Sequence, residues 1–422
     1  MTHGHSHDAP IETTAGRKRA LIGIVVALAV ATIVGIVVLW PSGDIKRSDE
    51  QLGLVSDVYA AEVTAVTPKP CAGTSRADGV PCERIRFRLS AGPDDGSVRS
   101  IEIPDSATSP QFEVGDQIVL SYDPRADPDF RYQFSDRQRR PVLLWLTVVF
   151  VVAVIALGRL RGAMALVGLG ASFVVLLEFV LPALVQGESP EAIAVVGSSA
   201  IAFLALYLAH GFRMMTAVAL LGTLSALALT VGLATLFTEL AQLTGFTSEE
   251  AILVLVGTQN LDLGGIVLAG MVLGALGALD DVTVTQASTV WEIRTANPDL
   301  PRWDLYRRGL RVGRDHVAST VNTLALAYAG AALPLLLLFV LADQSLGTIA
   351  NSEIVATEII RTLVGSIGLV SAVPLTTWLA VEFVSGGRTE RRVRLRRRPA
   401  GGERPAPEPV EAADRDEGDF WD

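Results

Sequence analysis

The feature that most constrains this chain is a recurring run of apolar residues, each about long enough to cross a lipid bilayer as a helix. A hydrocarbon core of about 30 Å requires roughly 20 apolar helical residues. Of the 422 residues, 50% are hydrophobic and only 19% are charged, which is too apolar for an ordinary soluble domain. The sequence therefore predicts an α-helical polytopic membrane protein.

We expect eight transmembrane spans. The first follows Arg17, Lys18 and Arg19 and lacks a small-residue cleavage site before Trp40, so we interpret it as an uncleaved anchor. The predicted spans are Ala20–Trp40, Val142–Leu157, Ala163–Leu181, Ala192–Leu208, Thr216–Phe237, Leu263–Leu279, Val317–Ala342 and Val355–Val384, of which the last seven form one bundle over residues 142–384.

The orientation follows from the arginines of the short loops, because cytoplasmic loops carry an excess of Lys and Arg. Arg159, Arg161, Arg213 and the groups 294–314 and 388–398 all fall on the N-terminal side. We therefore expect both termini in the cytoplasm. Arginines at 137, 139 and 140 fall on the other side, next to a large translocated segment where the rule is weak.

Residues 44–133 form the one sizeable soluble block, and their pattern differs from that of the spans. "VYAAEVTAV", "RIRFRLS", "SVRSIEI" and "QIVLSYDP" alternate apolar and polar residues between Gly, Pro and Asp turns, as half-buried strands do. We expect a small, mainly β extracytoplasmic domain of about five strands, OB-like or a sandwich. Such a domain could bind a ligand, but more often it is an extracytoplasmic platform or interaction module.

Both cysteines of the chain, Cys71 and Cys82, lie in this block on either side of a short Gly-rich stretch. In an oxidising compartment such a pair predicts a disulfide. The alternative, metal binding by two thiols alone, is less favoured.

The segment at 248–262 is apolar but only about half the length of a span. It is either an interfacial amphipathic helix or a re-entrant half-helix that breaks at "TQNLDLGG". Irregular backbone at membrane depth occurs where it lines protein or a cavity. In the re-entrant case Gln259, Asn260 and Asp262 would line an outward-facing site.

Two adjacent carboxylates, Asp280 and Asp281, end an apolar glycine-rich run in "GALGALDDVTVTQASTVWEI". Charge at membrane depth is costly and marks functional sites. On a continuing helix Asp281, Thr285, Ser288 and Glu292 share one face. This stripe is either a cation or proton site or the start of a solvated amphipathic helix.

A second polar stripe precedes the seventh span, in "GRDHVASTVNTLALAYAG". Because one cytoplasmic loop joins the two segments, we expect the stripes to face each other. Arginines such as Arg314 would then compensate the paired aspartates. The candidate residues of this second segment are Arg314, Asp315, Asn322 and Thr323.

Other polar features are weaker. Glu178 lies within a span and is a minor proton-site candidate, and His3, His5 and His7 alternate at a terminus that rarely makes a selective metal site.

We expect residues 1–19 and 385–422 to be disordered and cytoplasmic. The basic run at 388–398 is a positive-inside signal or a lipid contact, and we expect no nucleic-acid binding. Enzyme motifs such as HExxH, GxSxG and the P-loop do not occur, so we expect no enzyme, cofactor or metal.

These motifs together resemble one family of membrane proteins. "GALGALDDVTVTQASTVWEI", "GRDHVASTVNTLALAYAG" and "ALPLLLLF", with "GRLRG" and "LPAL", are similar to the bacterial YibE/F family over roughly residues 140–384. The resemblance implies about eight spans and a bacterial cytoplasmic membrane, but no settled reaction. It implies that the family's motif residues correspond to Asp281, Glu292, Asp315 and 322–324, with Asp280 as an additional acid.

The sequence thus favours a transporter or permease of a small solute or ion, whose inner vestibule contains Asp281, Glu292, Arg314, Asp315 and Asn322. The alternative is a non-transporting membrane scaffold whose β domain binds an envelope partner. In both cases the lipid bilayer is the surrounding medium.

Overall fold

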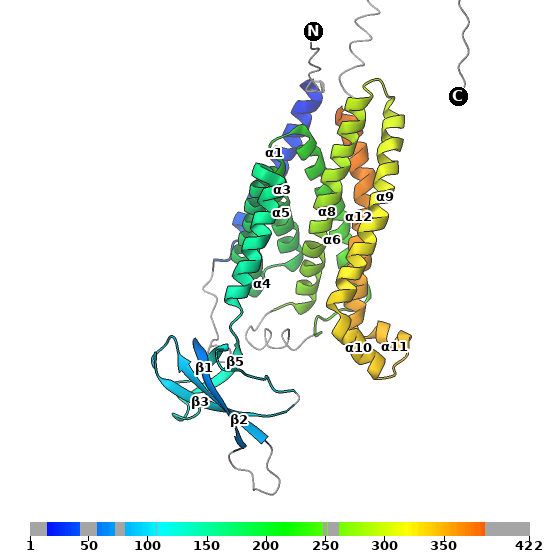
Figure 1. The fold of residues 1–422 in the computed structure, drawn as a ribbon. Coiled ribbons are helices and arrows are strands. Elements are labelled where there is room, and N and C mark those ends of the chain that lie inside the picture. The colour runs from blue at the N-terminus through cyan, green and yellow to red at the C-terminus, as the bar shows by residue number, and fades with distance from the viewer. Residues whose placement is uncertain are drawn as a thin grey trace, which may run out of the picture.

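The computed structural model describes residues 15–42, 57–71, 81–106, 108–247, 251 and 261–384. They form two parts, a small β domain and a bundle of long helices (Figure 1). The β domain follows the first helix in the chain and precedes all the others. This order agrees with the expectation of a β domain inserted after a first span.

The β domain is one antiparallel sheet of five strands: β1 (Asp57–Pro70), β2 (Pro81–Leu89), β3 (Val98–Pro104), β4 (Gln117–Tyr122) and β5 (Tyr132–Arg137). The strand order is β3-β2-β1-β4-β5. Alternate residues of the central strands point to one face, as the period of a strand requires. There Val63, Ile85, Phe87, Ile118 and Leu120 form a buried core.

The sheet curls, so that its two edge strands β3 and β5 approach each other. A sheet of this order that nearly closes on itself is a half-barrel of the OB type. The alternative expectation, a sandwich of two sheets, is wrong for the described residues, because a single sheet buries its core inside its own curvature.

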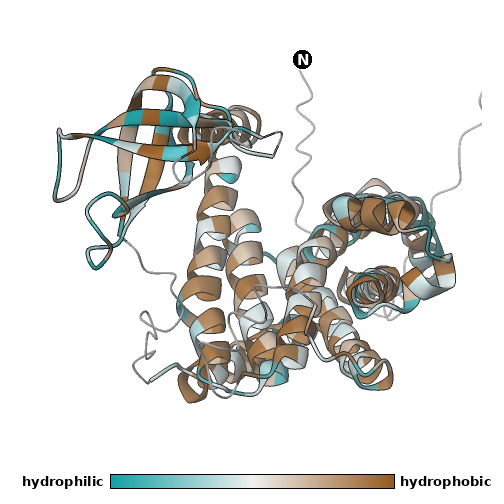
Figure 2. Cartoon of the chain, turned by 90° about the horizontal axis from the view of Figure 1, so that it is seen from below, coloured by the Kyte–Doolittle hydropathy of each residue, from teal (hydrophilic) through white to brown (hydrophobic). Residues whose placement is uncertain are grey.

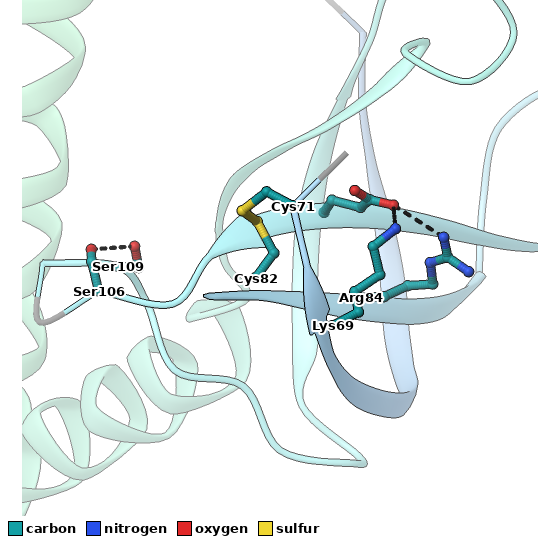
Figure 3. The surroundings of a disulfide bond; sticks show 7 residues. Lys69, Cys71, Cys82, Arg84, Ser106 and Ser109 are labelled. Atoms are coloured by element: carbon teal, nitrogen blue, oxygen red, sulfur yellow. Dashed lines mark hydrogen bonds and ion pairs between the residues drawn. A yellow bond between two sulfur atoms is a disulfide. The ribbon is translucent and has the colours of Figure 1, made fainter. Parts of the chain in front are cut away.

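A disulfide joins Cys71, after the end of β1, to Cys82 near the start of β2 (Figure 3). The predicted pairing is confirmed. Beside it Glu102 of β3 accepts hydrogen bonds from Lys69 and from Arg84, the second over 3.1 Å. The bond and this ion-pair group connect β1, β2 and β3 at one end of the sheet.

The helices of the bundle run alternately up and down (Figure 1). Their number and length follow the apolar runs of the sequence. The bounds are α1 (Ala15–Val38), α3 (Arg140–Val175), the π-helical turn η1 (Leu176–Val180), α4 (Leu181–Val185), α5 (Pro190–His210), α6 (Met214–Leu240), α8 (Leu263–Ala296), α9 (Arg302–Ala331), α10 (Leu333–Leu341), α11 (Leu346–Asn351) and α12 (Glu353–Val384).

The helix α3 reverses direction within its length. Arg159 has non-helical backbone angles, φ 52° and ψ −131°. A Cβ added at Gly162 would lie only 2.4 Å from the carbonyl oxygen of Val154, whereas residues eight apart in a straight helix are about 12 Å apart along the axis. The segment is therefore a helical hairpin, and its turn falls where the sequence places a short loop between two spans.

The predicted span Val317–Ala342 is not one straight helix. The helices α9 and α10 meet at Ala332 with a bend of 62°. Pro334 lies in the first turn of α10 and has no N–H to continue the helical ladder. The break follows from this proline.

Six described helices are long and apolar enough to cross a membrane, or seven if α9 and α10 count as one span. Arg140–Val185 enters this number as a single helix. Many large apolar side chains face outward, among them Trp145 and Leu144 with exposed fractions of 71% and 65%. Figure 2 shows apolar residues around the bundle and more polar residues on the β domain. A surface of this kind indicates a multi-pass membrane protein.

Small residues let α6 and α12 approach closely. A Cβ at Gly222 of α6 would lie 2.1 Å from Oγ1 of Thr376 on α12. One at Gly368 of α12 would lie 2.2 Å from Oγ1 of Thr230 on α6. Lipid tails are as apolar as the helices, so the hydrophobic effect does not bring helices together inside a bilayer. Close backbone contact of this type supplies the attraction there through van der Waals packing.

One carboxylate joins three chain segments at the end of the bundle away from the β domain. Glu382 of α12 forms an ion pair of 2.9 Å with Arg17 at the start of α1 and one of 3.4 Å with Arg302 at the start of α9. The start of α1 and the end of α12 thus lie on the same side of the bundle.

Candidate functional site

The site is built on α8, which continues without a break from the apolar run into the polar stripe. Asp280 lies near the middle of this helix and turns its carboxylate toward α6. Its Oδ1 is buried and has no hydrogen-bond partner within the part of the chain that the structure describes. An ionised carboxylate without a partner in an apolar interior is costly, so this atom can accept a proton or a cation.

Two threonines lie beside Asp280 in the core. The Oγ1 atoms of Thr223 on α6 and Thr283 on α8 are 2.7 Å apart, and Thr283 also donates to the carbonyl oxygen of Asp280 over 3.1 Å. Both threonines are fully buried. The carboxylate therefore lies next to hydroxyl oxygens that can share in binding a proton or a small cation.

One turn further along, Gln286 of α8 connects three helices. Its Nε2 donates to the carbonyl oxygen of Gly309 on α9 over 2.9 Å and to Oγ1 of Thr377 on α12 over 2.7 Å. The residue is 3% exposed. Sequence reasoning did not identify Gln286, although its position opposite the polar stripe, on the face toward the apolar core, was the available signal.

A groove between α8 and the α3–α5 pair opens beside the aspartates. Its apolar part is a cavity of about 650 Å³ whose lining includes Leu169, Phe173, Leu276, Asp280 and Asp281. Its polar part, of about 500 Å³, is lined by side chains that include Arg161, His210, Arg213, Ser288 and Glu292. The two parts share His210, Val284 and Thr285, so they form one continuous groove.

The predicted stripe of α8 is brought together here, because Asp281, Thr285, Ser288 and Glu292 all line the groove. The groups that face it come from α5 and from two turns. His210 lies within electrostatic range of Arg161, Arg213 and Asp281. Basic side chains therefore do lie beside this stripe, but they are not the ones that the sequence suggested.

The expectation that the second stripe faces the first is wrong. Helix α9 packs on α8 and α12 through its small residues, including Gly309 and Gly313, and this turns its polar face outward. Within the described ranges, no ion pair or hydrogen bond joins the polar stripe of α8 to the polar stripe of α9. The outward-facing, exposed residues are Arg314, Asp315, Asn322 and Thr323.

The weaker candidates lie elsewhere. Glu178 is an exposed residue of the π-helical turn and lines neither part of the groove. Asp262 caps α8, since its Oδ1 accepts a hydrogen bond of 3.0 Å from the backbone N–H of Gly265. It is therefore a helix-capping residue. Asn260 and most of the segment 248–262 lie outside the described residues.

A second polar group lies at the other end of the bundle and was not predicted. Arg361 of α12 forms an ion pair of 2.6 Å with Glu358, and its guanidinium lies 6.0 Å from the ring centre of Tyr328 on α9. The paired charges four residues or fewer apart on one helix were the signal in the sequence. An apolar cavity of about 240 Å³ adjoins Tyr328 and Glu358.

Among the residues that the structure describes, no group of three or more His, Cys, Asp or Glu side chains is placed to hold a metal ion. The three N-terminal histidines lie outside those residues.

The repeated apolar helices indicate a polytopic membrane protein, and the carboxylates of α8 with the groove beside them form a polar site within its bundle. Comparison with known families identifies it further, because the profile of the YibE/F-like protein family matches residues 146–386, which is more than half of the chain. The chain belongs to the YibE/F-like family. Neither a curated protein nor a solved structure matches it.

Proposed function

We propose that this protein is a transporter of a small solute or ion, and that Asp280 and Asp281 form its binding site. The observation that carries the proposal is the buried Oδ1 of Asp280, which has no hydrogen-bond partner among the described residues. Carboxylates of this kind inside a bundle mark ion or proton pathways. Asp281, one residue on, is exposed in the groove and connects the buried acid to its opening.

The proposal includes a topology of eight spans in a bacterial cytoplasmic membrane, with both termini in the cytoplasm and the β domain outside. Counting the arms of the α3 hairpin separately, and α9 with α10 as one span, gives this number. The ion pairs of Glu382 with Arg17 and Arg302 support a common side for the termini. The arginines of the turns support the cytoplasm as that side.

A second candidate function is that of a scaffold. The gap between the half-barrel's edge strands β3 and β5 holds a cavity of about 910 Å³, lined by Arg86, Arg99, Phe130 and Tyr132 among others. Open strand edges can accept a partner strand. In this reading an envelope protein binds the β domain. For neither candidate do we propose an enzymatic reaction.

Thermal unfolding of the purified full-length protein tests the first function. We would compare the wild type with Asp280→Asn and Asp281→Asn over monovalent and divalent cations and a panel of small solutes. A ligand of the folded state at a hundredfold excess over its Kd stabilises by about 2.7 kcal/mol. We expect at least one such ligand, with the stabilisation lost in Asp280→Asn.

The matched control is Asp315→Asn, because this exposed carboxylate of α9 lies outside the groove. It should respond to the ligand as the wild type does. If no ligand shifts the wild type, while Asp280→Asn alters only the baseline melting temperature, Asp280 is structural. Deletion of residues 44–133 and loss of partner capture would then favour the scaffold.

A further inference from the structure

The groove beside α8 is amphipathic along its length, which a site for a small ion alone does not require. Its apolar part is lined by aliphatic and aromatic side chains of α3, α5 and α8. Leu169 and Phe173 in this part have exposed fractions of 45% and 53%, so the groove faces the surroundings of the bundle. Its volume of about 650 Å³ is within the range of about 300–1,000 Å³ typical of ligand pockets.

Two arginines meet at the polar end. Arg161 comes from the turn of the α3 hairpin and Arg213 from the turn between α5 and α6. Both line the polar cavity, and neither takes part in an ion pair with any residue in the described ranges. A guanidinium matches a phosphate with two parallel hydrogen bonds. Basic pockets between helices at the cytoplasmic side bind lipid head groups in this way.

The three acidic residues of the groove, Asp280, Asp281 and Glu292, lie beside different groups. Asp280 turns toward Thr223 in the core, and Asp281 lies within electrostatic range of His210. Glu292 lies eleven residues beyond Asp281, which is about 16 Å along the helix. It lines the polar cavity together with Arg161 and Arg213 and does not line the apolar part. A ligand that fits carries an apolar chain at one end and both a phosphate and a cation at the other.

We propose that this groove binds a glycerophospholipid with an amine head group, such as phosphatidylethanolamine. An acyl chain lies along Leu169 and Phe173, the phosphate is bound by Arg161 and Arg213, and the ammonium lies at Glu292. The pairing of arginines with a carboxylate in the polar part, continuous with an apolar part, favours this occupant over a free anion, which would leave the apolar part unfilled. The inference goes beyond transport and does not depend on it.

The test is native mass spectrometry of the full-length protein purified in detergent, with melting curves in parallel. The probes are phosphatidylethanolamine, phosphatidylglycerol, glycerophosphoethanolamine, which has the head group without chains, and inorganic phosphate. The double variant Arg161→Gln/Arg213→Gln should bind phosphatidylethanolamine about tenfold or more weakly, since hydrogen bonds to charged groups are lost. The control Arg307→Gln/Arg308→Gln changes the same charge on exposed residues of α9 outside the groove and should bind as the wild type does.

Glu292→Gln should remove the preference for phosphatidylethanolamine over phosphatidylglycerol. If the arginine variant does not purify in a folded form, Leu169→Trp narrows the apolar part from a half-exposed position and should weaken binding of the lipid. Equal loss in the control variant, or equal binding by the wild type and the arginine variant, would overturn the proposal. So would equal stabilisation by inorganic phosphate or glycerophosphoethanolamine, or a wild type that binds both lipids alike.

Discussion

The contact of α6 with α12 gives the sharpest test of the bundle. In Gly222→Ala the new Cβ would lie 2.1 Å from Oγ1 and 3.0 Å from Cβ of Thr376. Because Cβ of Thr376 is itself part of this contact, a change of its χ1 rotamer does not relieve the overlap, and the two helices must move apart. Overpacking of this kind costs about 1–3 kcal/mol, while replacing a helical glycine by alanine returns up to about 1 kcal/mol.

The control lies on the same helix. A Cβ at Gly232 would meet nothing within 4 Å, so Gly232→Ala should be neutral or stabilising by up to about 1 kcal/mol. The two alanine variants should thus differ by about 1–3 kcal/mol, with Gly222→Ala the less stable. For a bundle of this size the difference corresponds to about 2–4 °C in Tm per kcal/mol, measured by thermal unfolding in one detergent.

Thr376→Ala in the background of Gly222→Ala removes Oγ1 and should restore part of the loss, as expected for two residues in contact. If Gly222→Ala were as stable as Gly232→Ala, the close approach of α6 and α12 would be refuted.

Three further results are expected. Gln286→Leu leaves a buried carbonyl and a buried hydroxyl without their donor and should lower the free energy of unfolding by about 1–3 kcal/mol, measured by thermal unfolding with Gln344→Leu, at an exposed position, as control. Cys71→Ser opens the disulfide and should destabilise the β domain by about 2–4 kcal/mol; a melting transition of that domain unchanged by the variant and by reductant would contradict this. Burial, and then the hydrogen bond to Asp94, raise the pKa of Tyr132 to about 12. Because the folded pKa lies above the unfolded value near 10, its contribution to stability is complete below pH 10 and is lost as pH rises through 12. Absorbance titration should show one tyrosinate forming near pH 12 that is missing in Tyr132→Phe.

The element pattern was predictable because it depends on local properties. Apolar runs of about 20 residues specify helices, and alternation with turn residues specifies strands. The disulfide followed from two cysteines flanking a short loop. The polar stripe from Asp281 to Glu292 was predictable from the period of 3.6 residues alone, and the structure places all four of its residues along one groove.

What faces that stripe was not predictable. The sequence suggested α9, since one loop joins it to α8, but Gly309 and Gly313 turn the small face of α9 inward and leave Asp315 and Asn322 outside. Similarly, nothing local shows that Gln286 reaches Gly309 and Thr377. Which faces of two helices meet depends on the fit of many side chains over a long interface. The helical periodicity of a single sequence shows which residues share a face, but not which face of another helix they contact.

The sequence by itself therefore determined the class of protein, the β domain after the first helix and the carboxylates of α8, because hydrophobicity and periodicity act within one segment. Only the tertiary structure decided that Asp280 turns toward α6, that Asp281 opens to a groove, and that Arg161 and Arg213 meet at its end. Those placements arise from contacts between segments far apart in the chain, where packing and charge compensation select one arrangement among many with the same helices.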